Sequence, residues 1–270
     1  FTDWLSLSTR IGTDFYSDSR TQRYEIGSRS FPSGQITQEE YVYNNFNTFI
    51  NLMGTKYFGD DHSLSYNIGT EFYQSQFTLL STTGSGFSFA GFMNMGNASS
   101  ITSATSISRN RTYSLFGSIE YGFRNYLYLT VTARNDWLSS LINPSVDFDA
   151  ANISVFYPSA SLSFVFSELM PKNDILSFGK VRFSFAQVGG GAPSPYLTGT
   201  NYTATTIGDG WTNGITFPFL GQTGFTFANT LGSSELKPSL TTDLEAGLDL
   251  RFAKGRLNLD FTYYNRRSTN

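Results

Sequence analysis

Apolar and polar side chains alternate along most of this 270-residue chain, and this pattern limits the possible fold more than any other feature. Successive side chains of a β-strand point to opposite faces of a sheet, so a period of two indicates strands with one apolar and one polar face. The pattern recurs in nine segments, at about 5–15, 44–58, 63–72, 114–123, 127–134, 156–166, 180–185, 243–252 and 257–263. The sequence therefore predicts an all-β chain.

Charged residues fall on the polar side of this alternation. Leu129 and Val131 share one parity, for example, while Arg134 takes the other. A charge that faces lipid costs about 2–4 kcal/mol at the middle of the bilayer, so a lipid-exposed strand requires this segregation. We expect the apolar set to face lipid: Leu129, Val131, Leu162, Phe164, Leu248 and Leu250. We expect the charged set to face a lumen: Arg134, Lys180, Arg182, Glu245 and Asp249.

The connections between these segments alternate between long and short. The long ones cover roughly 16–41, 75–111, 138–155 and 189–239, and the short ones cover 59–62, 124–125, 167–177 and 253–255. Outer-membrane barrels combine long extracellular loops with short periplasmic turns. The sequence thus predicts a transmembrane antiparallel up-and-down β-barrel whose odd-numbered strands run outward. Bacterial barrels have an even number of strands, so about nine strands indicate part of a larger barrel.

A soluble β-sandwich is the main alternative fold, because its strands also alternate and its turns are rich in glycine. Sandwich loops have no reason to segregate by length, which favours the barrel. The composition agrees, with 17% aromatic but only 14% charged residues. A net charge of -3 gives no basic surface for nucleic acid, and the absence of cysteine excludes disulfides and thiolate metal sites.

Catalysis finds little support in the sequence. The sole histidine, His62, is expected to be an exposed turn residue, which leaves no basis for a serine–histidine triad or a multi-histidine metal site. Asp243 and Glu245 share a strand face and could form a glycosidase pair. A charged lumen wall explains them better, because Asp249 and Arg251 continue the same row. We expect no enzyme activity, no metal site and no cofactor.

Several segments carry motifs of a known family. Residues 126–137 read YLYLTVTARNDW, 156–163 read FYPSASLS and 176–182 read LSFGKVR. Near the end, LKP at 236–238 precedes EAGLDLRF at 245–252 and LNLDFTYYN at 257–265. The second half of the chain, and more loosely the first, resembles the SusC/RagA class of TonB-dependent outer-membrane transporters.

The resemblance implies a barrel of about 22 strands in the bacterial outer membrane, with a plug in its lumen and energy supplied through TonB. It also implies a SusD-like surface lipoprotein that captures glycans or peptides. The plug and the remaining strands are not in this chain, so 1–270 is expected to be a single partial barrel domain that neither folds nor transports alone. A passive porin or an adhesin barrel remains the alternative function.

The longest connection is rich in aromatic residues. Tyr196, Tyr202 and Trp211 lie in it and, by the strand directions, would emerge outside the cell. Such rings could stack on a substrate or contact the lipoprotein. The alternative is that they pack the connection against itself.

Overall fold

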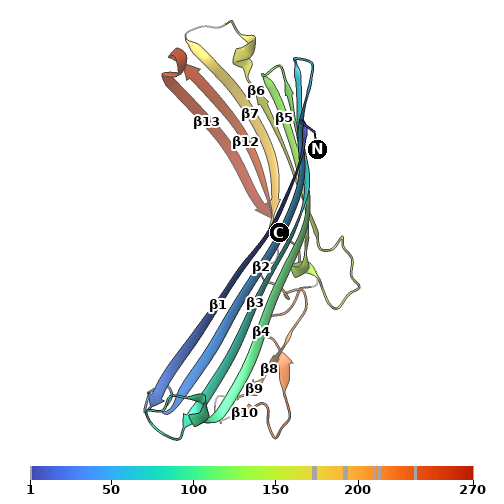
Figure 1. The fold of residues 1–270 in the computed structure, drawn as a ribbon. Coiled ribbons are helices and arrows are strands. Elements are labelled where there is room, and N and C mark those ends of the chain that lie inside the picture. The colour runs from blue at the N-terminus through green and yellow to red at the C-terminus, as the bar shows by residue number, and fades with distance from the viewer. Residues whose placement is uncertain are drawn as a thin grey trace. The chain divides into compact units, whose positions relative to one another are not determined.

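The computed structural model describes residues 2–171, 175–190, 194–208, 211, 214–233 and 236–269. Within these residues, nine strands form one sheet in which each strand lies beside its neighbour in chain order (Figure 1). They are β1 (Leu5–Ile26), β2 (Ser33–Phe58), β3 (His62–Phe87), β4 (Ala98–Phe123), β5 (Leu127–Leu138), β6 (Ser154–Phe164), β7 (Leu176–Gly189), β12 (Leu240–Phe252) and β13 (Leu257–Thr269). This simple up-and-down order confirms the predicted topology and differs from the Greek-key order of a sandwich.

Short elements occupy the connections. Two pairs of strands form separate small sheets, β8 (Tyr202–Ala204) with β11 (Phe225–Phe227) and β9 (Thr206–Ile207) with β10 (Ile215–Thr216). The helical turns are all of the 3-10 type: η1 (Met95–Asn97), η2 (Ser139–Leu141), η3 (Phe166–Leu169) and η4 (Ala253–Gly255). Among the described residues no helix is long and apolar enough to cross a membrane, a finding that does not bear on crossing by strands.

The chain divides into two compact units. Unit 1 consists of Phe1–Ser8, Ile50–Glu71 and Thr112–Asn270, and unit 2 consists of Thr9–Phe49 and Phe72–Arg111. Each unit contains a segment of every strand from β1 to β4. That 1–270 acts as a single domain stays a prediction.

In unit 1, strand register separates an apolar from a polar face. One row across β5, β6, β7, β12 and β13 holds Leu129, Leu162, Phe183, Ala246 and Tyr263. The adjacent row holds Thr130, Ser161, Ser184, Glu245 and Tyr264. Since neighbouring rows point to opposite faces, the predicted lipid-facing set and the predicted charged set lie on opposite sides of this sheet.

Unit 2 corrects two of the predicted connections. Residues 16–41 and 75–111 were expected to be long loops, but β1 continues to Ile26, β2 begins at Ser33, and β3 and β4 cover most of 75–111. Alternation did not reveal these strand segments, because odd-numbered and even-numbered positions are both largely hydrophilic there. In β4, for instance, even positions 98–110 hold only Ala, Ser, Thr and Asn. Threonine, tyrosine and strand pairing still favour extended backbone where no apolar face is needed.

The remaining connections agree with prediction. The described parts of 139–153 and 190–239 are long and irregular, whereas β2–β3, β4–β5 and β12–β13 are joined by short turns. The last two short turns use left-handed residues, with φ of 47° at Arg124 and 58° at Lys254. The alternation of long and short connections therefore survives for β5 to β13.

Candidate functional site

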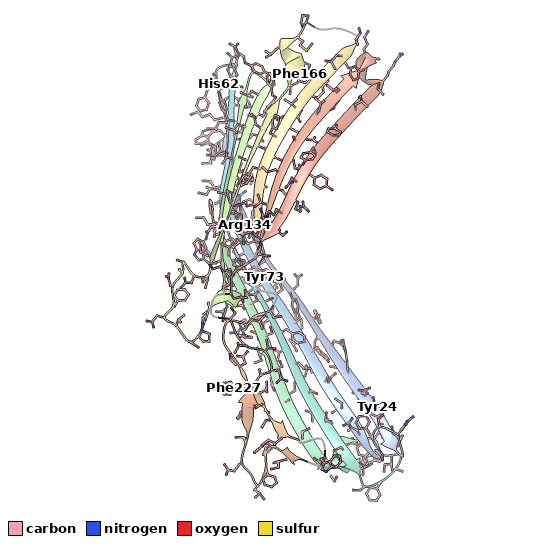
Figure 2. The ribbon with its side chains drawn as sticks, turned by 180° about the vertical axis from the view of Figure 1, so that it is seen from behind. Tyr24, His62, Tyr73, Arg134, Phe166 and Phe227 are labelled. Carbon is pink, nitrogen blue, oxygen red and sulfur yellow. The ribbon has the colours of Figure 1, made fainter. Side chains whose placement is uncertain are left out.

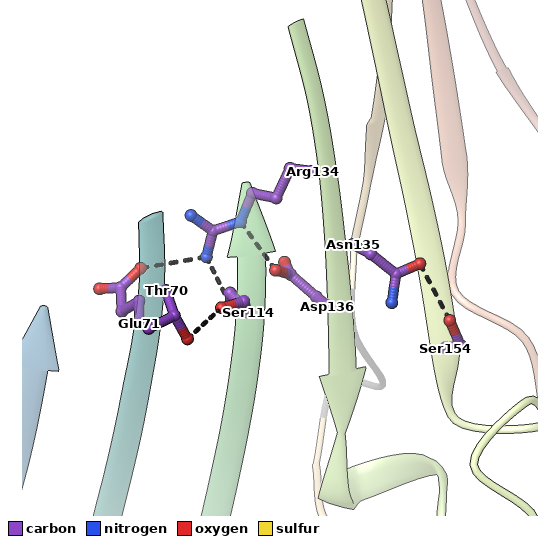
Figure 3. Close-up of polar contacts among 7 residues, drawn as sticks. All are labelled: Thr70, Glu71, Ser114, Arg134, Asn135, Asp136 and Ser154. Carbon is purple, nitrogen blue, oxygen red and sulfur yellow. Dashed lines mark hydrogen bonds and ion pairs between the residues drawn. The ribbon is translucent and has the colours of Figure 1, made fainter. Parts of the chain in front are cut away.

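Arg134 is the centre of a polar network on the charged face of unit 1 (Figure 3). Its Nη2 lies 3.1 Å from Glu71 Oε2 and donates to Ser114 Oγ at 2.8 Å, while its Nε donates to Asp136 Oδ1 at 2.7 Å. The hydroxyl of Thr70 donates to the backbone carbonyl of Ser114 at 2.9 Å. One guanidinium thus connects β3, β4 and β5.

The strands place these groups without special loop geometry. Arg134 and Asp136 are two residues apart on β5 and so share a face, and Phe116 on β4 is the register partner of Arg134. Ser114 is almost fully buried at 1% exposure, which makes its hydrogen bonds costly to lose. The network therefore supplies a fixed polar surface in which one guanidinium is shared by two carboxylates.

A second ladder crosses β7, β12 and β13. The Arg182 side chain passes over Gly247, where a Cβ would collide with it, and its Nη2 reaches Thr262 Oγ1 at 2.6 Å and Asp260 Oδ1 at 3.2 Å. Arg266 Nε donates to Asp243 Oδ1 at 2.6 Å, and Arg251 Nη2 lies 3.6 Å from Asp249 Oδ2. Glycine at position 247 is what allows the arginine to cross β12.

The predicted lumen-facing residues thus belong to one face. Lys180 is the register partner of Asp249, and Arg182 is the register partner of Gly247. Glu245 lies on the same parity of β12 as Asp249, and Arg134 lies on the matching parity of β5. That this face lines a lumen stays a prediction. The sequence could not reveal Glu71 and Ser114 as partners of Arg134, because these pairings link residues more than 19 positions apart.

The connection that follows β7 carries the predicted ligand contacts. Tyr202 on β8 pairs with Phe227 on β11, with ring centroids 4.8 Å apart, and Phe227 is labelled in Figure 2. Trp211 is 94% exposed and Tyr196 is 52% exposed. Tyr202 therefore has a packing partner inside the connection, and Trp211 presents the most open ring of the three.

A small apolar core holds this connection to the one between β5 and β6. The core consists of Leu138, Leu141, Ile153 and Val155, with Leu236 and Leu240 packed against it. Thr198, which is 3% exposed, donates a hydrogen bond to the Ile142 carbonyl at 2.5 Å. Alternation alone did not predict this core, and its one signal in the sequence is the spacing of Leu138 and Leu141.

His62 corrects another prediction. It was expected to be an exposed turn residue, but it begins β3 and is partly buried. Its Nδ1 lies 2.6 Å from the Tyr121 hydroxyl, and its ring centroid lies 5.0 Å from that of Phe123. Among the described residues, no group of three or more histidine, cysteine, aspartate or glutamate side chains is arranged to hold a metal ion.

Comparisons with known proteins agree with this architecture. TonB-dependent receptor P3 of Formosa agariphila is 25% identical over 173 residues, which is 63% of this chain and 16% of that protein. The RagAB peptide transporter has a TM-score of 0.82 at 17% identity, over 99% of this chain and 28% of that chain. The RagAB peptide importer in its open-open state gives a TM-score of 0.80 with the same identity and coverage.

These similarities to RagAB establish the fold of the chain but not its function. At 17% identity, the RagAB structures show that the chain shares their fold, and this chain spans only a small part of each relative. The decisive match is to the family described as TonB dependent receptor-like, beta-barrel, which extends over residues 1–270. Both the predicted fold and the predicted family are confirmed: the chain belongs to the TonB-dependent receptor β-barrel family.

Proposed function

We propose that residues 1–270 form part of the barrel wall of a TonB-dependent transporter in the bacterial outer membrane. The observation that carries the proposal is the two-faced sheet of unit 1, in a chain whose whole length matches the family. Its apolar rows suit contact with lipid, and the arginine-centred networks suit a water-filled lumen. The chain would supply strands, lumen wall and substrate-side connections, with no catalytic role of its own.

We further propose that the complete protein imports glycans or peptides together with a SusD-like surface lipoprotein, using energy delivered by TonB to a plug. The SusC/RagA motifs support this, as does the fold shared with RagAB, which is described as a peptide importer. Both substrate classes stay within the proposal. A connection with an exposed tryptophan is compatible with either, because aromatic rings stack on sugar faces and on apolar side chains.

Trp211 provides the sharpest test of the substrate side. In the full-length transporter, we expect Trp211→Ala to lower nutrient uptake roughly two- to twelvefold, since an aromatic stack contributes about 0.5–1.5 kcal/mol beyond its burial. Leu231→Ala is the matched control, because Leu231 is 84% exposed in the same connection. Tyr202→Ala also removes the contact with the Phe227 ring, so its effect on uptake is compared with its effect on outer-membrane abundance. Outer-membrane abundance should be unchanged in all strains.

Three outcomes distinguish the alternatives. Uptake that persists in a strain without TonB would indicate a passive porin. Equal uptake by wild type and Trp211→Ala, with unchanged recovery of the co-purifying lipoprotein, would remove Trp211 from the contact surface. A fall in abundance would show that the ring mainly holds the connection together.

A further inference from the structure

The short turns at one end of unit 1 carry an aromatic and charged cluster on the apolar face of the sheet. Its rings are those of His62, Tyr121, Phe123, Tyr126 and Phe164. The Phe123 and Tyr126 ring centroids are 5.5 Å apart, and those of Tyr126 and Phe164 are 6.1 Å apart, both in edge-on geometry. Figure 2 labels His62 at this end of β3. Amphipathic rings gathered at strand ends are typical of a membrane–water interface.

The charges of the cluster have both signs. Arg124 Nε lies 3.0 Å from Asp61 Oδ1, and its Nη2 donates to Asp61 Oδ2 at 3.0 Å. The guanidinium carbon also lies 5.2 Å from the centroid of the Phe123 ring. A guanidinium has five N–H donors, so these contacts leave donors for a further anion. Asp60 precedes Asp61 and is exposed. The Arg124 guanidinium is therefore paired with the Asp61 carboxylate, and a second carboxylate follows from the neighbouring position in the sequence.

The strands that end in this cluster also form an apolar groove. It has a volume of about 580 Å³ and is lined by Leu64, Tyr66, Ile68, Leu115, Ile119 and Val131. Leu64 and Ile68 lie two and six residues beyond His62 on β3, about 7 and 20 Å along the strand. With a strand tilt of about 45°, these positions lie roughly 5 and 14 Å deep, within one half of a hydrocarbon core of about 30 Å.

We propose that the cluster and the groove together bind one glycerophospholipid with a phosphoethanolamine headgroup, in the leaflet beside the short turns. Arg124 binds the phosphate, Asp60 and Asp61 bind the ammonium group, and an acyl chain lies in the groove. The paired signs select this zwitterion over an anionic headgroup, which the two carboxylates would repel. The inference rests on the proposed outer-membrane placement.

Two variants test the two halves of the site. Arg124→Asn removes the cation and suits the left-handed backbone there, since asparagine tolerates positive φ. Ala133→Leu places a larger apolar side chain in the groove, which Ala133 also lines. Lys254→Asn is the matched control, because it removes a basic residue of similar φ from a different short turn. The groove variant keeps the headgroup cluster intact, so it tests the acyl contact alone.

The measurement uses full-length transporter purified from outer membranes in mild detergent, with bound lipids quantified by mass spectrometry and then restored as phosphatidylethanolamine or phosphatidylglycerol. We expect phosphatidylethanolamine on the wild type and on Lys254→Asn. We expect about tenfold less on Arg124→Asn, which loses one charge-assisted contact, and a similar loss on Ala133→Leu, where the larger side chain displaces the acyl chain. Equal retention of phosphatidylglycerol, equal loss in Lys254→Asn, or no loss in Ala133→Leu would overturn the site. A folded, importing transporter without bound lipid refutes only this inference, whereas absence from the outer membrane refutes the proposed function as well.

Discussion

The two units of this chain build β-strands from different sequences. In unit 1, Leu162 lies between Leu129 and Phe183 in an apolar row, and charged residues stay in the alternate rows. In unit 2, both parities are largely polar, and the contacts are those of polar and aromatic groups. Arg109 donates to Gln76 at 2.6 and 2.9 Å, and the Tyr16 and Tyr43 rings stack with centroids 5.2 Å apart.

The difference between the units shows what alternation in the sequence indicates about a strand and what it does not. A strict period of two with all charges on one parity indicates that the strand has an apolar face and a polar face. By the proposed function, the apolar face contacts lipid. Alternation does not indicate where strands end. Strands in unit 2 persist because backbone pairing and side-chain contacts across strands suffice to hold them. In the connection at 88–97 of unit 2, the buried Asn97 side chain accepts a hydrogen bond from the Phe89 N–H and donates to the carbonyls of Phe89 and Phe92.

The largest difference between the units should appear when an apolar residue of each is replaced by arginine and the abundance of the folded protein is compared. We expect Leu162→Arg to reduce the outer-membrane abundance of the full-length protein severely, because arginine on a lipid face costs about 2–4 kcal/mol near the bilayer midplane. Ile107→Arg in unit 2 should leave abundance within about twofold, since surface substitutions usually change stability by less than about 0.5 kcal/mol. Heat-modifiable migration of the barrel in gels measures the folded fraction of both variants.

Matched starting exposure makes this comparison fair. Leu162 is 41% exposed and Ile107 is 53% exposed, so solvent accessibility alone predicts similar tolerance. If both variants fold equally well, the apolar face of unit 1 does not meet lipid.

Arginine networks offer a second contrast. Arg134→Ala should lower the free energy of unfolding by about 1–3 kcal/mol, because it leaves Glu71 and Asp136 without their cation and Ser114 without a donor. Arg20→Ala should lower the free energy of unfolding much less, since Arg20 and Asp18 are 61% and 40% exposed and solvent screens their ion pair. Urea titration of the refolded protein in detergent micelles gives both values, and Arg134→Lys should be intermediate because it keeps charge but not the fork geometry. If Arg134→Ala and Arg20→Ala lower the free energy of unfolding equally, the greater burial of the Arg134 network does not make it more stabilising.

Much of unit 1 was predictable and much of unit 2 was not, for physical reasons. Alternation fixed which residues share a face, so Arg134, Lys180, Arg182, Glu245 and Asp249 were grouped correctly on one face. The ends that lie in unit 2 were predicted wrongly, namely the end of β1, the start of β2, the end of β3 and the start of β4, because serine, threonine and glutamine occur in strands and loops alike. Pairings such as Arg182 with Asp260 depend on register between strands that are far apart in sequence, which one sequence does not specify. The burial of His62 against Tyr121 has the same cause.

The smallest effect belongs to the turn between β2 and β3, where a hydrogen bond from Arg124 holds the pKa of Asp61 below its usual value. A lowered carboxyl pKa in the folded state means that the pair stabilises the fold above the unfolded pKa of about 3.9, and that this stabilisation is lost as pH falls through the folded value. We therefore expect wild type to unfold at a slightly higher temperature than Asp61→Asn at neutral pH. The two melting curves should converge in acid, as measured by thermal unfolding in detergent from neutral pH downward.

Salt provides the control for this last prediction. The pair is exposed, at 56% for Arg124 and 44% for Asp61, so about 1 M salt should shrink the neutral-pH difference by screening. A difference that survives both acid and salt would show that the Asp61 side chain stabilises the turn by a contact other than its ion pair with Arg124, because Asp61→Asn keeps the backbone carbonyl that accepts the Arg124 N–H at 2.8 Å.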